Sequence, residues 1–145
     1  MILNSFYAFV SSLGFGILFN IRGKNLIIAS IGGGLGWFTY LLTSSLQPSV
    51  SFSLFIASMV VSIYSEIMAR IYKNPVTMFV ICAIIPLVPG GGMYYSTLEA
   101  VRGNFEIALS KSIVTLFSAG AIAIGIIFVA SISSILKKIK KQNLN

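Results

Sequence analysis

The sequence is poor in charged residues and in the side chains that bind metals or act as nucleophiles. Of its 145 residues 9% are charged, three are acidic, histidine is absent and Cys82 is the only cysteine. A single cysteine excludes a disulfide within the chain, and the usual His/Cys metal sites cannot be built. Because no nucleophile–base pair or metal cluster is present, we expect neither an enzyme nor a cofactor. Cys82 is interpreted as a small apolar helix residue.

Long uncharged apolar runs make up most of the chain. Hydrophobic residues account for 57% of it, and no charge occurs in residues 1–21, 26–63 or 112–136. A helix needs roughly 20 such residues to cross a bilayer. The sequence therefore predicts an all-α integral membrane protein, with residues 1–145 as a single transmembrane domain. The first run lacks a preceding basic segment and a small-residue cleavage site, so we expect a retained helix and not a secretory signal.

About five transmembrane helices are predicted, separated by short polar segments. The fourth begins near Pro75, which suits the first turn of a helix, and is broken by proline and glycine. An uncharged turn is expected at residues 47–49. The other four helices are expected at residues 3–19, 26–45, 52–68 and 112–135.

Basic residues fall between the apolar runs and give a formal net charge of +7. Lys and Arg concentrate on the cytoplasmic side of membrane helices, so we expect a bacterial plasma-membrane protein with its N-terminus outside and its C-terminus in the cytoplasm. The charge is thus interpreted as topology and not as a nucleic-acid site. The basic tail, residues 137–145, would anchor the chain at anionic lipid headgroups. Arg102 and Lys111 lie outside in this topology, against eight residues inside: Arg22, Lys24, Arg70, Lys73, Lys137, Lys138, Lys140 and Lys141.

A proline- and glycine-rich segment follows the short fourth apolar run. A helix from Val76 to Ile85 would be about 15 Å long, roughly half of the hydrocarbon thickness, so the break is predicted inside the membrane. Broken helices expose backbone groups that lipid cannot satisfy, and transporters use them as solute sites. An extracellular turn that ends a tilted helix is the alternative. The predicted substrate pathway consists of Pro86, Pro89, Gly90, Gly91, Gly92, Tyr94 and Tyr95.

The third predicted helix carries a polar stripe. Ser58, Ser62, Ser65 and Glu66 follow helical spacing, and Arg70 lies one turn beyond Glu66. An intramembrane carboxylate is costly and indicates a functional role, so Glu66, Arg70 and Ser62 are candidates for proton coupling. The alternative is an interfacial Glu66 that only pairs with Arg70.

A second charged group follows the break. Glu99, Arg102 and Glu106 are spaced three and four residues apart, which predicts a helical segment over residues 95–110 with its own ion pairs. Arg102 is a candidate contact for a substrate carboxylate. The alternative is a solvated amphipathic lid.

Small residues recur at the spacing that lets membrane helices approach closely. Gly32 and Gly36 form one such pair, and Ala121 and Gly125 form another, so we expect them to pack helices or subunits. The neighbouring residues 33–34 could instead unwind the second helix. Aromatic residues such as Trp37 are interpreted as packing or interface residues.

Residues Glu66 to Tyr95 resemble the threonine/serine exporter family, in particular short stand-alone subunits that match the C-terminal half of full-length exporters. The resemblance lies in an acid, then Ala69-Arg70, then Pro75, then the run Ile85-Pro86-Leu87-Val88-Pro89-Gly90 and a downstream tyrosine. The helix ending Gly16-Ile17-Leu18-Phe19-Asn20 and the apolar tail around Gly120 and Gly125 are also similar.

This resemblance implies a proton antiporter that exports small polar metabolites. Threonine and serine are the substrates associated with full-length members, and succinate with a two-subunit system. It also implies a partner, a separate subunit related to the missing N-terminal half; a homo-oligomer is the other assembly considered. The runner-up function is a non-transporting membrane assembly subunit, in which a partner would close the broken segment to solvent.

Overall fold

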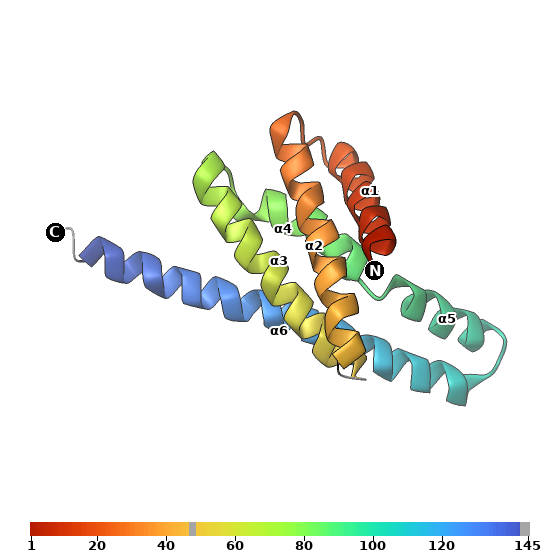
Figure 1. Ribbon diagram of the computed structural model, residues 1–145. Coiled ribbons are helices and arrows are strands. Elements are labelled where there is room, and N and C mark those ends of the chain that lie inside the picture. The colour runs from red at the N-terminus through yellow and green to blue at the C-terminus, as the bar shows by residue number, and fades with distance from the viewer. Residues whose placement is uncertain (47–48, 143–145) are drawn as a thin grey trace.

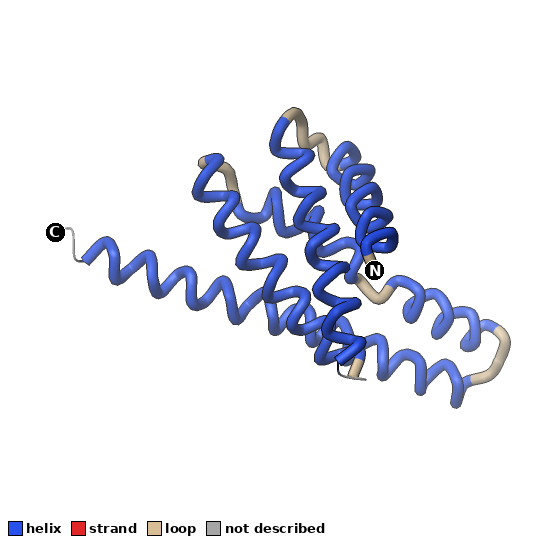
Figure 2. Tube along the Cα trace, viewed as in Figure 1, coloured by secondary structure: helices blue, strands red, loops and turns tan. Residues whose placement is uncertain are grey.

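The computed structural model describes residues 1–46 and 49–142, and every regular element in these residues is helical (Figures 1 and 2). The predicted turn at residues 47–48 and the last three residues of the basic tail lie outside the described residues. The elements in chain order are α1 (Ile2–Leu18), α2 (Lys24–Leu46), α3 (Val50–Tyr72), α4 (Val76–Ile84), the 3-10 turn η1 (Ile85–Leu87), α5 (Gly90–Val101) and α6 (Phe105–Gln142).

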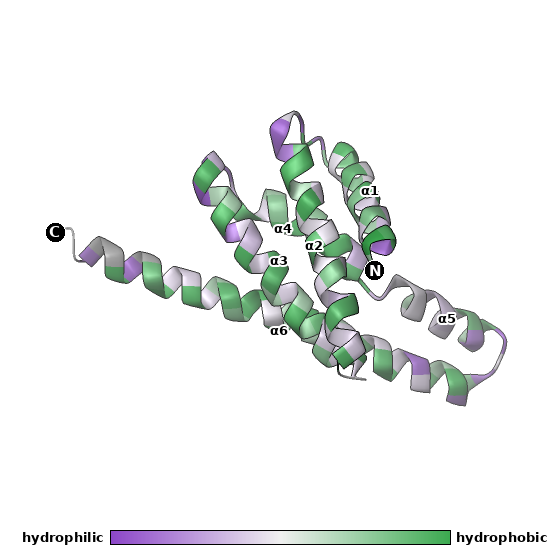
Figure 3. Cartoon of the chain, in the orientation of Figure 1, coloured by the Kyte–Doolittle hydropathy of each residue, from purple (hydrophilic) through white to green (hydrophobic). Residues whose placement is uncertain are grey.

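Among the described residues, three helices, α2, α3 and α6, are long and apolar enough to cross a membrane. The segments Val76–Leu87 and Gly90–Val101 are bent by 53° relative to each other and together form either a fourth, broken span or a re-entrant loop. With 17 residues, α1 is about 26 Å long, a little short of the roughly 30 Å hydrocarbon core. The structure therefore supports a multi-pass helical membrane protein with three or four spans, and the predicted count of about five is not confirmed. Figure 3 shows hydrophobic residues along these helices and hydrophilic ones mainly at turns and ends.

Glycines let α2 pack closely against α1, α3 and α4. A methyl group at Gly32 would lie 2.9 Å from Ala83 of α4, and one at Gly36 would collide with Val61 of α3. Gly33 leaves room for the Ser12 side chain of α1 in the same way. Because α2 is one uninterrupted helix from Lys24 to Leu46, the suggested unwinding at residues 33–34 is wrong. These glycines serve helix packing, as the small-residue spacing predicted for Gly32 and Gly36.

The last helix, α6, passes across α3 and forms an antiparallel pair with α5 (Figure 1). Its 38 residues begin seven positions before the predicted start at Ser112 and continue into the basic tail. Gly125 lies against Ser58 and the backbone of Phe55 on α3, which confirms close packing for one member of the second small-residue pair. One face of α6 is buried and consists mainly of small or hydroxylated residues: Ala108, Thr115, Ser118, Ile122, Val129 and Ser133.

Several buried hydroxyl groups on α3 and α6 donate to carbonyl groups of their own helices. Ser65 donates to the carbonyl of Val61 at 2.8 Å, and Ser118 donates to that of Val114 at 2.9 Å. Such bonds to the preceding turn allow hydroxyl side chains in an apolar interior without a partner on the neighbouring helix. The interface between α3 and α6 thus depends mainly on close packing.

Candidate functional site at the helix break

The break between α4 and α5 is short and consists of residues 85–89. Val88 donates to the carbonyl of Ile85 at 3.2 Å, and the backbone then leaves the helical region at Val88 and Pro89. Proline cannot donate a backbone hydrogen bond, which explains why the helix stops here. The three glycines were expected to extend the break, but they form the first turn of α5 instead. Here the amide of Met93 closes the turn by donating to Pro89 at 3.1 Å.

The break lies level with the middle of the longest neighbouring helices. Leu87 is buried and packs in one cluster with Val61 and Ala83. Val61 is the twelfth of 23 residues in α3, and Gly36, which lies against Val61, is the thirteenth of 23 in α2. Since α2 and α3 are long enough to span a bilayer, this contact favours a break near the membrane midplane over an extracellular turn.

A cavity of about 300 Å³ adjoins the break and is lined by Asn4, Tyr7, Ala8, Ser11, Trp37 and Pro86. Its walls come from α1, α2 and η1, so it combines an amide, hydroxyl groups and an indole ring with the first proline of the break. We call it the break pocket. Sequence reasoning missed the α1 residues and assigned Trp37 to packing. Asn4, a polar residue within an uncharged apolar run, was the available signal.

The other predicted pathway residues do not line this pocket. Tyr94 and Tyr95 are exposed, with ring centroids 5.3 Å apart in an edge-to-face arrangement. A methyl group at Gly90 or Gly91 would meet nothing within 4 Å, whereas Gly92 lies against Thr115 of α6. The structure therefore brings Pro86 to a pocket and leaves the two tyrosines on an open face of α5.

Glu66 and Arg70 lie near the end of α3, and Arg70 contacts α6. The Glu66 side chain is 12% exposed, and its Oε2 lies 3.5 Å from Arg70 Nη2. The same Arg70 nitrogen donates to Ser133 Oγ of α6 at 2.8 Å. Ser62, also predicted here, is buried one turn before Glu66. Glu66 is five residues beyond Val61, so this group is displaced from the break by about 7.5 Å along α3.

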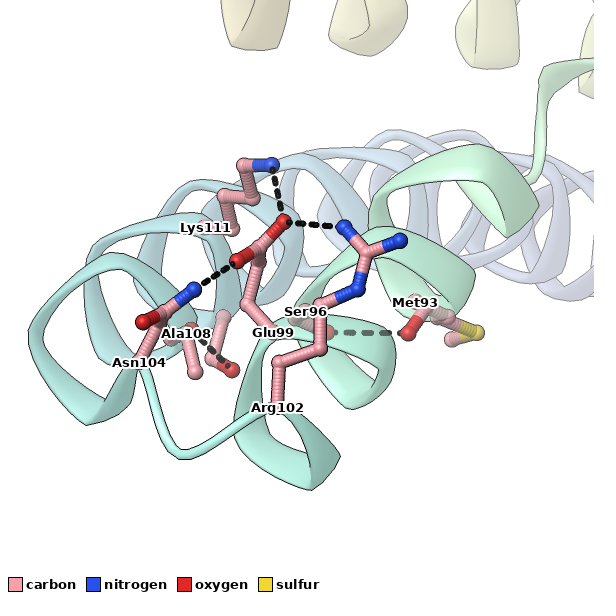
Figure 4. A network of polar contacts seen from close by, with 8 residues as sticks. Met93, Ser96, Glu99, Arg102, Asn104, Ala108 and Lys111 are labelled. Carbon is pink, nitrogen blue, oxygen red and sulfur yellow. Dashed lines mark hydrogen bonds and ion pairs between the residues drawn. The ribbon is translucent and has the colours of Figure 1, made fainter.

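The charged residues after the break hold the turn between α5 and α6 (Figure 4). Glu99 Oε1 lies 3.6 Å from Arg102 Nη1 and 3.9 Å from Lys111 Nζ, and Asn104 donates to Glu99 Oε2 at 2.8 Å. The predicted single helix over residues 95–110 is wrong. The chain turns at Gly103, whose φ of +83° strongly favours glycine, and Glu106 lies in the first turn of α6.

Within the described residues, no group of three or more His, Cys, Asp or Glu side chains could hold a metal ion. The break pocket itself presents amide, hydroxyl and aromatic groups. Such a pocket can bind and orient a small polar solute by hydrogen bonds.

Comparison with known proteins gives a family match for this chain. The family described as "Threonine/Serine exporter, ThrE" matches residues 4–132. An "Uncharacterized protein" of Haemophilus influenzae (strain ATCC 51907 / DSM 11121 / KW20 / Rd) is 27% identical over 134 residues, which cover 87% of this chain and 45% of that protein. The chain thus spans less than half the length of this relative. No solved structure matches the chain.

Proposed function

Because the chain belongs to the threonine/serine exporter family, we propose that it is one subunit of a secondary transporter that exports small polar metabolites. Threonine and serine are the first candidate solutes, and a small dicarboxylate such as succinate is the second. Export would be driven by proton antiport across a bacterial plasma membrane, with the N-terminus outside and the C-terminus in the cytoplasm.

The observation that carries this proposal is the helix break at the depth of mid-α3, beside a pocket whose lining includes amide and hydroxyl groups. Broken helices place backbone dipoles at solute sites in many transporters. The pocket volume of about 300 Å³ is at the lower end of the range usual for ligand pockets, roughly 300–1,000 Å³. A pocket of this size suits an amino acid or a four-carbon acid.

A partner is part of the proposal. The three or four spans within the described residues are few for an alternating-access pathway, and a relative that matches this chain is more than twice as long as its matched part. We infer that a subunit related to the N-terminal half of the full-length exporters supplies the remaining helices. Apolar side chains on α5 and α6, such as Met93 and Phe117, are exposed and would contact lipid or this partner.

Glu66 is the proposed proton-coupling residue. Its side chain is largely buried, and Arg70 lies close enough to stabilise the carboxylate. Proton binding would weaken this pair and, through Arg70, the contact with Ser133 of α6. Ser62, one turn away on the same face, would provide a hydroxyl group next to the carboxyl group.

The test is efflux from bacterial cells that lack their own exporters, loaded with threonine, serine or succinate. Cells would express this chain alone, the N-terminal-half subunit alone, or both. We expect efflux only with both chains and its loss when an uncoupler collapses the proton gradient. No efflux of any of the three solutes, with both chains verified in the membrane, would favour the non-transporting assembly subunit.

Two variants assign roles within the working pair. Ser11→Ala removes a hydroxyl group from the break pocket and should reduce efflux, whereas Ser45→Ala on the exposed end of α2 should not. Glu66→Gln should uncouple efflux from the proton gradient, with Glu99→Gln as a control that loses the same charge elsewhere. A Glu66→Gln exporter with full gradient dependence would eliminate the coupling role.

A further inference from the structure

A second cavity lies beyond the other end of α1 from the break pocket. It has a volume of about 440 Å³ and lies between the α1–α2 loop and the start of α4. Between the two cavities α1 is tightly packed, with Ser12 and Gly16 buried. We call the second cavity the loop pocket.

The loop presents a positioned arginine to this pocket. Arg22 Nε donates to Asn20 Oδ1 at 3.0 Å, so one edge of the guanidinium group is held while its two terminal nitrogens remain for a ligand's oxygens. Positive φ angles at Asn20 and Gly23, +59° and +64°, shape the loop. Ile21 between them is buried against the α4 core and anchors the loop.

The remaining polar wall also suits an anionic group. Asn25 contributes an amide, and Thr77 contributes a hydroxyl group in the first turn of α4. The first amides of a helix and its dipole favour a negative charge at this position. Glu66, Glu99 and Glu106 are the only acidic residues of the chain, and the part of the pocket that the structure describes is lined by none of them.

The floor of the loop pocket is apolar. Met78 and Cys82 form it, and Cys82 packs in the core next to Ile21. A ligand with one anionic end and a short carbon body fits this division between a cationic rim and an apolar floor. A carboxylate forms two parallel hydrogen bonds with a guanidinium group, which fixes its orientation.

We propose that the loop pocket binds the carboxylate of the exported solute on the cytoplasmic side, before the solute reaches the break pocket. The assignment of solute and direction rests on the proposed function, because the basic α1–α2 loop is cytoplasmic in that topology. Arg22 and Asn25 bind the carboxylate, and Thr77 lies beside it.

Protection of an introduced thiol tests binding without transport. In a Cys82→Ser background, Thr77→Cys places a single thiol in the lining of the loop pocket. In the same background, Lys24→Cys places a single thiol at a nearby residue that does not line the pocket. The probes are threonine, serine and succinate, with threoninol as a matched control that lacks the carboxylate. Both chains are present in inside-out vesicles, and the labelling rate with a maleimide is measured.

We expect a carboxylate-bearing solute to slow labelling of the thiol at position 77 about tenfold at saturation. Threoninol should leave this labelling rate unchanged, and no solute should change the labelling rate of the thiol at position 24. Adding Arg22→Gln should abolish the protection. Equal protection by threoninol, or no protection by any of the three solutes, would overturn the proposal. Protection in solute-free vesicles of phosphatidylglycerol, but not of phosphatidylcholine, would also overturn it, because it would assign the pocket to a lipid headgroup.

Efflux kinetics separate this inference from the proposed function. Arg22→Gln should raise the half-saturating cytoplasmic solute concentration about tenfold with little change in maximal rate, since it removes a charge-assisted contact. Lys24→Gln, which loses the same charge two residues away, should match the parent. Protection without efflux would contradict the exporter and keep the pocket, whereas efflux without protection would contradict the pocket alone.

Discussion

The contact between α6 and α3 at Gly125 allows a sharp test of the packing. An added methyl group at Gly125 would collide with Ser58 Oγ and lie 2.9 Å from the Phe55 carbonyl oxygen. A side chain could rotate away, but a backbone oxygen cannot, so Gly125→Ala must push the two helices apart. Gly120 on the same helix offers the matched control, since a methyl group there would meet nothing within 4 Å.

The expected magnitude follows from two opposing terms. Replacing glycine by alanine within a helix stabilises it by about 0.8–1.0 kcal/mol, and this gain is common to both variants. Overpacking a close contact costs about 1–3 kcal/mol, and this cost applies only at position 125. The free energy of unfolding should therefore be about 1–3 kcal/mol lower for Gly125→Ala than for Gly120→Ala.

Unfolding in mixed detergent micelles, titrated with dodecyl sulfate and followed by far-ultraviolet circular dichroism, measures this difference. Each variant is compared with the parent chain: Gly120→Ala shows the helix-propensity gain by itself, and Gly125→Ala shows the same gain minus the packing cost. Equal stability of the two variants would refute the described α3–α6 contact, because the propensity terms cancel.

Three further substitutions test other contacts. Tyr64→Phe removes the hydrogen bond that the Tyr64 hydroxyl donates to the Ile28 carbonyl at 2.8 Å, and should lower the free energy of unfolding by about 1 kcal/mol in the same titration. Ser133→Ala removes the acceptor for half-exposed Arg70 and should lower the free energy of unfolding by about 1 kcal/mol or less. A larger decrease would show that this hydrogen bond contributes more than a partly exposed contact should. Because Arg102 pairs with Glu99, Arg102→Ala should leave the half-saturating concentration in the efflux assay unchanged, and a clear rise would support the predicted substrate-carboxylate contact.

Features set by local chemistry were predictable from the sequence. The uncharged runs predicted an all-helical membrane protein, and Pro86 and Pro89 predicted where the fourth apolar segment breaks, because proline removes a donor wherever it lies. The glycine spacing on α2 predicted close helix contact. The number of membrane spans was harder to predict, since α1 has only 17 residues and the broken segment can be either a broken span or a re-entrant loop.

Features set by tertiary contacts were missed. Asn4 and Ser11 line the break pocket only because α1 packs beside η1, which no local pattern reveals. The glycines after Pro89 were expected to be open backbone, but packing of Gly92 against Thr115 supports a helix there. A single glycine, Gly103, redirects the chain between α5 and α6, and the regular spacing of Glu99, Arg102 and Glu106 concealed that turn.

The locally satisfied hydroxyl groups on α3 and α6 also bear on movement. Because Ser65 and Ser118 keep their hydrogen bonds within their own helices, a shift of α6 along α3 would carry each bond with its helix and break neither. The hydrogen bond from Arg70 to Ser133, in contrast, crosses from α3 to α6 next to Glu66. A shift of α6 along α3 would have to break the Arg70–Ser133 bond, and the carboxyl group proposed to take up protons lies beside that bond.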